Sequence, residues 1–257
     1  MQRDVDARRI QRLMEALEYL TERQISLIEE VVNQFRKPFV QLERLTTSDI
    51  VNDCLLQDFG DALRIHHCFS KELFTKDKFE YALEKVSNLC GHKAKLAPKG
   101  KPGHDITIND KRFSLKTEAS NSISANRLHI SKFMELGKGT WTDEVKHLKG
   151  LCEQFFHHTE AYDRIMSLRC LSQGRPNWRY ELVEIPMALL HEARLGTYRI
   201  QSESRQQPKP GYCDVLDKAG SIRLQLYFDG GTERKLQIKN LQKSLCVVHA
   251  TWIFIIA

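Results

Sequence analysis

The chain has 257 residues, enough for one large domain or two small ones with a sizeable core. Its net charge of +6 fits a nucleic-acid partner without requiring one, and its seven scattered cysteines, never paired as CxxC, argue against a disulfide framework and a zinc site. The charged start is unlike a signal peptide and no apolar run approaches the length of a membrane-spanning helix, so we expect a cytoplasmic protein that does not contact a membrane.

The beginning of the chain has a helical pattern. Apolar residues recur at helical spacing up to residue 37, which predicts two helices, and Thr21 is placed to cap the second. Pro38 ends the pattern. We assign residues 1–70 to a helical N-terminal segment that serves packing or dimerisation, and residues 71–257 to the functional core.

Two glutamates lie on one predicted helix. Residues 71–90 have an amphipathic pattern, and Glu80 and Glu84, four residues apart, share a face beside the apolar one. A solvated helix surface paired with lysines would explain either glutamate equally well. The lysine-rich loop that follows, residues 91–103, includes Lys101 and could contact phosphates.

A β-hairpin is predicted over residues 105–118, because two segments of alternating polar and apolar residues flank a turn. Side chains two residues apart share a strand face, so Ser114, Lys116 and Glu118 point the same way. The hairpin thus has an acid, Asp105, at the head of one strand and a lysine with an acid on the other.

This arrangement resembles the PD-(D/E)xK nuclease motif. In such nucleases, carboxylates hold Mg²⁺ through oxygen, the cation activates water and neutralises charge on the scissile phosphate, and the lysine binds that phosphate. Asp105 and Lys116 match the motif, whereas Ser114 stands where Asp or Glu is usual. An ordinary exposed hairpin would show the same spacing.

One metal ligand is therefore left to assign. Glu118 lies on the same strand face as Lys116. In this nuclease class the helix before the hairpin often supplies a further carboxylate, which makes Glu80 the first choice there and Glu84 the second. We keep Asp105, Glu118 and Glu80 as candidate metal ligands.

The rest of the chain predicts more strands and two more helices. Residues 141–171 give the longest helical pattern, and Pro186 begins a short helix that ends near Arg194. Alternating apolar residues predict strands at residues 127–133, 178–185, 222–228, 233–241 and 245–254. We therefore expect an α/β fold with a mixed central sheet, helices on both sides and a helical N-terminal segment.

A second hairpin imitates the first. Asp229 is followed by Gln237 and Lys239, again an acid and a lysine on adjoining strands. We rank this hairpin lower because its acid lies beside a Gly-Gly turn and no glutamate-bearing helix precedes it. Its tip, with Arg234 and Lys235, is better suited to DNA reading, since Arg and Lys pair well with guanine.

Seven segments together resemble the SmaI-like type II restriction endonucleases, in the same order and over about residues 48–254. The segments are PGHDITI at 102–108, LKTEA at 115–119, HISKFMELGKG at 129–139, LVEIP at 182–186, PKPGY at 208–212, YFDGGTERKLQIKNL at 227–241 and VHATW at 248–252. The resemblance implies a restriction-endonuclease-like fold and a Mg²⁺-dependent homodimer that cuts double-stranded DNA at CCCGGG to leave blunt ends. It also implies a DNA methyltransferase as genetic partner.

An all-G·C palindrome favours basic readers presented by a two-fold dimer. Arg234 and Lys235 are the first candidates, followed by Lys132 and Lys138, with Lys101 as a phosphate contact. Two other functions remain open on the sequence: a DNA repair nicking nuclease of the same fold, and a DNA-binding module whose catalytic site has degenerated at Ser114.

Overall fold

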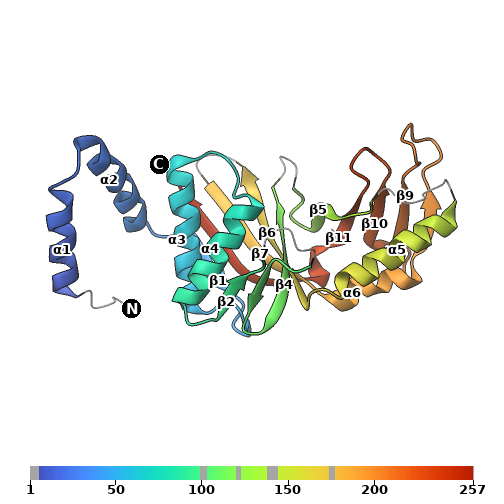
Figure 1. Cartoon of the computed structure of the whole chain (residues 1–257), viewed down its shortest axis with the longest axis horizontal. Coiled ribbons are helices and arrows are strands. Elements are labelled where there is room, and N and C mark those ends of the chain that lie inside the picture. The colour runs from blue at the N-terminus through green and yellow to red at the C-terminus, as the bar shows by residue number, and fades with distance from the viewer. Residues whose placement is uncertain (1–5, 99–102, 120–122, 138–143, 174–176, 257) are drawn as a thin grey trace.

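Two β-sheets organise the chain (Figure 1). The computed structural model describes residues 6–98, 103–119, 123–137, 144–173 and 177–256. The first sheet has the strand order β1-β12-β7-β6-β4-β3-β2, and the second has the order β5-β11-β10-β9-β8. Among the described strands, β4 and β6 are parallel neighbours, while the other pairs are antiparallel.

The first sheet is formed by β1 (Gln41–Arg44), β2 (Ala94–Leu96), β3 (Ile106–Ile108), β4 (Lys111–Glu118), β6 (Arg164–Gln173), β7 (Asn177–Ile185) and β12 (Val247–Ile255). The second is formed by β5 (Arg127–Glu135), β8 (Thr197–Ile200), β9 (Gly211–Leu216), β10 (Ile222–Asp229) and β11 (Lys235–Gln242). The helices are α1 (Ala7–Leu17), α2 (Glu22–Arg36), α3 (Asp53–Phe69), α4 (Lys76–Leu89), α5 (Val145–Thr159) and α6 (Met187–His191), with short 3-10 turns at Glu192–Leu195 and Lys243–Leu245.

Two apolar cores hold the helices and sheets together. Helices α3 and α4 cover one face of the first sheet, where Phe59 and Phe79 pack among the strand residues Phe113 and Leu115. Helices α5 and α6 pack against the second sheet in the other core, which also includes residues of β6 and β7. The expected α/β fold with a mixed sheet, flanking helices and N-terminal helices is therefore confirmed.

The N-terminal helices form an arm beside this body (Figure 1). Thr21 caps α2 as predicted, in a capping box with Gln24. At the other end of α2, the fully buried Arg64 of α3 donates hydrogen bonds to the carbonyls of Gln34 and Lys37, where the helix ends. Helix α1 has no buried residue.

The third helix belongs with the core. Its apolar residues lie in the same buried cluster as those of α4, on the other side of the boundary that we predict at residue 70. That division of the chain stays a prediction. No helix in the described ranges is long and apolar enough to cross a membrane.

The predicted helix at residues 141–171 is wrong in its second half. Helix α5 ends at Thr159, and residues 164–173 form β6. This strand lies inside the sheet between β4 and β7, so residues on both of its faces are buried, from Ile165 to Cys170. A strand covered on both faces does not alternate in polarity, and its apolar run imitates the continuation of a helix.

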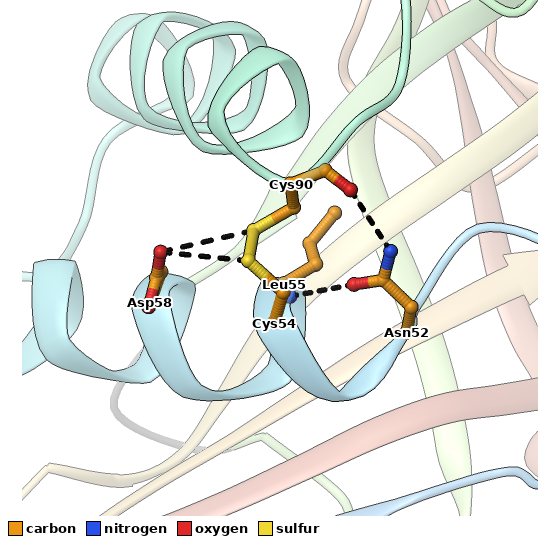
Figure 2. The surroundings of a disulfide bond; sticks show 5 residues. All are labelled: Asn52, Cys54, Leu55, Asp58 and Cys90. Carbon is orange, nitrogen blue, oxygen red and sulfur yellow. Dashed lines mark hydrogen bonds between the residues drawn. A yellow bond between two sulfur atoms is a disulfide. The ribbon is translucent and has the colours of Figure 1, made fainter. Parts of the chain in front are cut away.

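The prediction about cysteines also needs correction. Cys54 at the start of α3 and Cys90 at the C-terminal end of α4 form a disulfide (Figure 2). Asn52 donates a side-chain hydrogen bond to the Cys90 carbonyl and accepts one from the amide of Leu55, so the same corner is also joined by hydrogen bonds. The two cysteines are thirty-six positions apart, a spacing that gave no sequence signal for this pair.

Candidate active site

The hairpin β3–β4 fixes the carboxylate of Asp105. Asn109 and Asp110 both have positive φ, as a tight two-residue hairpin turn requires, and this sets the register that pairs Ile106 with Phe113. The amide of Asp105 donates to the Phe113 carbonyl at 2.8 Å. Its side-chain Oδ2 accepts a 2.6 Å hydrogen bond from the amide of Leu115. One carboxylate oxygen is therefore held by β4, while the other is directed elsewhere.

Ser114 contributes to the same anchor. Its hydroxyl donates to Oδ2 of Asp105 at 3.3 Å, and the residue is buried. The side chain that replaces the usual acid of the motif therefore positions the neighbouring aspartate.

The second oxygen of Asp105 contacts helix α4. Oδ1 lies 2.8 Å from Nζ of Lys76, and the same ammonium lies 3.3 Å from Oε1 of Glu80. Burial alone would lower the pKa of Lys76, but the hydrogen bond and the charge of Asp105, together with Glu80, raise it instead. One cation thus bridges two carboxylates from different elements.

Glu80 is held in an environment that disfavours its charge. Burial raises the pKa of its carboxyl, the ammonium of Lys76 opposes this shift, and the negative charge of Asp105 adds to it. Two acids that repel each other and share a cation are the arrangement expected of a metal-binding pair. The structure therefore brings Asp105 and Glu80 together, as the sequence predicts.

Lys116 completes this group. Burial lowers the pKa of its ammonium to about 8, and the nearby charges of Asp105, Lys76 and Glu80 modify that shift. Its Nζ lies 5.2 Å from the centre of the Phe133 ring. Lys76 and Lys116 both line a cavity of about 320 Å³ between β4 and β5.

Lys132 lines the same cavity and pairs with Glu135 at 2.8 Å. Glu135 lies opposite Lys235 in the pairing of β5 with β11, and the charge of Glu233 also acts on Lys132. Lys132 therefore lies on β5 between the candidate catalytic group and the tip of the β10–β11 hairpin.

Glu118 has other partners. Its Oε2 pairs with the fully buried Arg169 at 2.5 Å, and its Oε1 accepts a hydrogen bond from the amide of His129. Arg169 also donates to the carbonyls of Ser124 and Arg127. These contacts attach Glu118 to the junction between the sheets, and its expected role as a metal ligand stays a prediction.

Glu84, the second choice on α4, accepts a hydrogen bond from the amide of Leu96 at 2.8 Å. This contact links α4 to strand β2 and gives the Glu84 carboxylate a structural role. Of the two glutamates on this face, it is Glu80 whose side chain shares a cation with Asp105.

The rival hairpin has a different arrangement. The carboxylate of Asp229 accepts hydrogen bonds from the amide of Gly231 and from the side chain of Gln237. Lys239 lies over the Tyr227 ring at 3.6 Å, and burial lowers the pKa of its ammonium. Neutral donors thus satisfy this acid, and its lysine is stacked on an aromatic ring.

The candidate readers lie at the tip of that hairpin. Arg234 has a positive φ, and its carbonyl accepts a hydrogen bond from the amide of Leu136 at the end of β5. Lys235 pairs with Glu233 at 3.2 Å. Arg234 lines an open hollow with residues of the 206–207 loop. Lys101 and Lys138 lie outside the described residues.

Sequence reasoning missed Lys76. As an i, i+4 partner of Glu80 at the start of a helix, it has the signature of an ordinary surface ion pair. The signal that could have identified it is its face, which it shares with the candidate ligand. Tyr162, whose buried hydroxyl has no hydrogen-bond partner in the described structure, was also missed; burial and the charge of Asp105 raise its pKa.

The donor set fits a hard divalent cation. Asp105 and Glu80 offer carboxylate oxygens, which Mg²⁺ prefers, and they already share a positive charge on Lys76. In contrast, the sulfur-containing cluster of Cys54, Asp58 and Cys90 has both of its sulfurs in the disulfide. The carboxylate pair is therefore the better candidate for a catalytic metal.

Comparison with known proteins defines the class of enzyme. The chain is a type II site-specific deoxyribonuclease, because the family model of that description matches residues 13–254. It belongs to the SmaI family of restriction endonucleases. It is 46% identical over 212 residues to the type II restriction enzyme SmaI of Serratia marcescens, an alignment that covers 82% of this chain and 84% of that relative. No solved structure matches. Restriction endonucleases generally depend on a metal, in agreement with the acidic pair.

Proposed function

We propose that this protein is a Mg²⁺-dependent, homodimeric restriction endonuclease that cuts both strands of CCCGGG at its centre, leaving blunt ends with 5′-phosphates. The family membership and the resemblance of the 227–241 segment support the site and the cut. The observation that carries the chemistry is that Asp105 and Glu80 share the ammonium of Lys76, and that Lys76 and Lys116 line one cavity.

Each side chain has a task in this mechanism. Asp105, anchored by Ser114 and the Leu115 amide, and Glu80 would hold Mg²⁺ through oxygen. When bound, the cation would lower the pKa of water and neutralise charge on the scissile phosphate. Lys116 would contact a phosphate oxygen and orient the attacking water from the cavity it lines. Water would attack phosphorus in line with the 3′-oxygen, whose bond breaks to give a 3′-hydroxyl and a 5′-phosphate.

We also propose that the N-terminal arm packs against a second copy of the chain. Its two helices expose apolar side chains at Ile10, Leu13, Met14, Leu27 and Val32. Each chain supplies one Asp105–Lys116 group, and a palindrome cut in both strands needs two such groups related by a two-fold axis. The pairing of apolar faces from two identical arms would bury these exposed side chains and would bring two catalytic groups into one dimer.

Sedimentation of the Leu13→Asp variant tests the arm. We expect a dimer for the unchanged protein and a shift toward monomer for the variant, since a charge would enter the apolar contact. An unchanged sedimentation coefficient at dilute concentration would place the dimer interface elsewhere.

The remaining parts of the proposal are a cytoplasmic location in a bacterium and a methyltransferase that protects the same site.

The activity is tested with a plasmid carrying one CCCGGG site. We expect a linear product in Mg²⁺, none in EDTA, and none after methylation of the site. Sequencing of the product ends gives the cut position. A nicked circle as the final product would contradict the double-strand cut, and cleavage elsewhere would contradict the site.

A further inference from the structure

The ammonium of Lys76 occupies the position between the two acids of the candidate metal pair. It contacts Oδ1 of Asp105 at 2.8 Å and Oε1 of Glu80 at 3.3 Å. One oxygen comes from the residue just before β3 and the other from helix α4, and the ammonium is the group that joins them. An ordinary ion pair on the surface of α4 would join Lys76 to Glu80 alone and would not include Asp105.

Lys76 is also placed so that it can leave. Its side chain is 40% exposed, whereas those of Asp105 and Glu80 are 20% and 21% exposed. It lines the cavity that Lys116 and Lys132 also line. A long, flexible side chain could therefore swing from the acids into the cavity without any movement of the backbone.

We propose that Lys76 is a built-in competitor for the divalent cation: it neutralises Asp105 and Glu80 in the metal-free protein and is displaced into the cavity when the metal binds. A divalent cation and an ammonium that contact the same oxygens repel each other strongly at such short separation. Binding of the cation therefore requires the loss of two ion pairs. Lys76 sets the affinity for metal by this cost, without being a ligand itself.

This inference rests on the proposed metal role of Asp105 and Glu80, and it predicts a gain of affinity. Lys76→Met keeps most of the length and removes the charge. We expect the DNA-free variant to bind Mn²⁺ about three- to tenfold more tightly than the unchanged protein, the range expected for the loss of partly exposed ion pairs. The measurement is the electron paramagnetic resonance signal of free Mn²⁺ during a titration, which does not depend on cleavage.

Two control variants separate an effect of the Lys76 charge from a general effect of substitution on the structure. Lys76→Arg keeps a positive charge and should bind Mn²⁺ as weakly as the unchanged protein. Lys78→Met removes an exposed lysine two residues away on the same helix and should leave the affinity unchanged. Thermal unfolding of each variant shows that the fold is retained. An affinity for Lys76→Met that is equal to or weaker than that of the unchanged protein would overturn the inference, because the lysine would then be neutral toward the metal or would help to hold the acids in place.

Asp105→Asn separates this result from failure of the proposed function. In the Lys76→Met background, it should abolish the tightened binding. If Asp105→Asn weakens Mn²⁺ binding but Lys76→Met does not tighten it, the metal site stands and the competitor role is wrong. If tight binding persists without Asp105, the metal lies elsewhere and both proposals are wrong.

Discussion

The β3–β4 and β10–β11 hairpins carry the same sequence pattern, an acid followed by a lysine on the adjoining strand, in different surroundings. One oxygen of Asp105 contacts the ammonium of Lys76, a partly exposed cation that a metal could replace. Both oxygens of Asp229 are taken by the Gly231 amide and the Gln237 side chain. The comparison shows that the partners of the acid, more than its spacing from a lysine, distinguish a candidate catalytic hairpin from a structural one.

The strongest test exchanges each acid for its amide. Asp105→Asn should reduce the cleavage rate by about 10³-fold or more, because the charge that holds the metal is lost while the shape is kept. Asp229→Asn should retain most of the activity. Single-turnover digestion of a one-site plasmid, with binding to the same DNA measured in parallel, gives both rates. Loss of cutting with normal binding in Asp229→Asn, and not in Asp105→Asn, would reverse the assignment of the two hairpins.

The lysines provide a second matched pair. Lys116→Met should slow cleavage by about 10²–10³-fold, since a cationic contact to the charge that develops on the phosphate is removed. Lys239→Met, at the corresponding place in the other hairpin, removes a lysine that lies over Tyr227 and should affect the rate much less. Rates at saturating Mg²⁺ are the measurement. Equal losses in both variants would mean that the cavity near Phe133 is not the reaction site.

Substitutions of the two α4 glutamates test which carboxylate joins Asp105 in the candidate metal site. Glu80→Gln should lower the rate on the order of 100-fold at limiting Mg²⁺ and recover in excess Mg²⁺, because a weakened site can still be filled. Glu84→Gln should have little effect on the metal dependence, as its carboxylate binds the Leu96 amide. The Mg²⁺ concentration for half-maximal rate is the readout.

Glu118→Gln distinguishes its two possible roles in the same assay. If Glu118 only neutralises Arg169, the variant should lose about 1–3 kcal/mol of unfolding free energy, because one of the two acids that pair with this buried guanidinium loses its charge. Its half-maximal Mg²⁺ concentration should then be unchanged. A raised Mg²⁺ requirement without loss of stability would instead support the ligand role predicted from the sequence.

The smallest expected effect concerns the recognition of DNA bases by the β10–β11 hairpin. Arg234→Ala should reduce discrimination against a single G·C substitution by about 1–3 kcal/mol, while cleavage of the cognate site at saturation continues. Competition binding with cognate and substituted duplexes measures this. A uniform fall in affinity for all duplexes, with a weaker salt dependence, would make Arg234 a phosphate contact.

The sequence indicated which candidate residues lie near one another better than it indicated the elements around them. Strand and helix periodicities place side chains on particular faces, and this was enough to group Asp105, Lys116 and Glu80 as candidates. Strand β6 was missed because burial on both faces removes the alternation that marks a strand. Lys76 was missed because the feature that makes it notable is a contact with a residue twenty-nine positions away, which helix periodicity does not show.

One buried guanidinium has a consequence for the whole molecule. Arg169 lies in β6 of the first sheet, pairs with Glu118 at the end of β4, and donates to the carbonyl of Arg127, the first residue of β5 in the second sheet. A restriction enzyme must break the backbone at a constant offset from the bases it recognises. With the candidate catalytic hairpin in one sheet and the candidate reading hairpin in the other, the contacts of Arg169 join the two sheets and would keep this offset the same from one DNA molecule to the next.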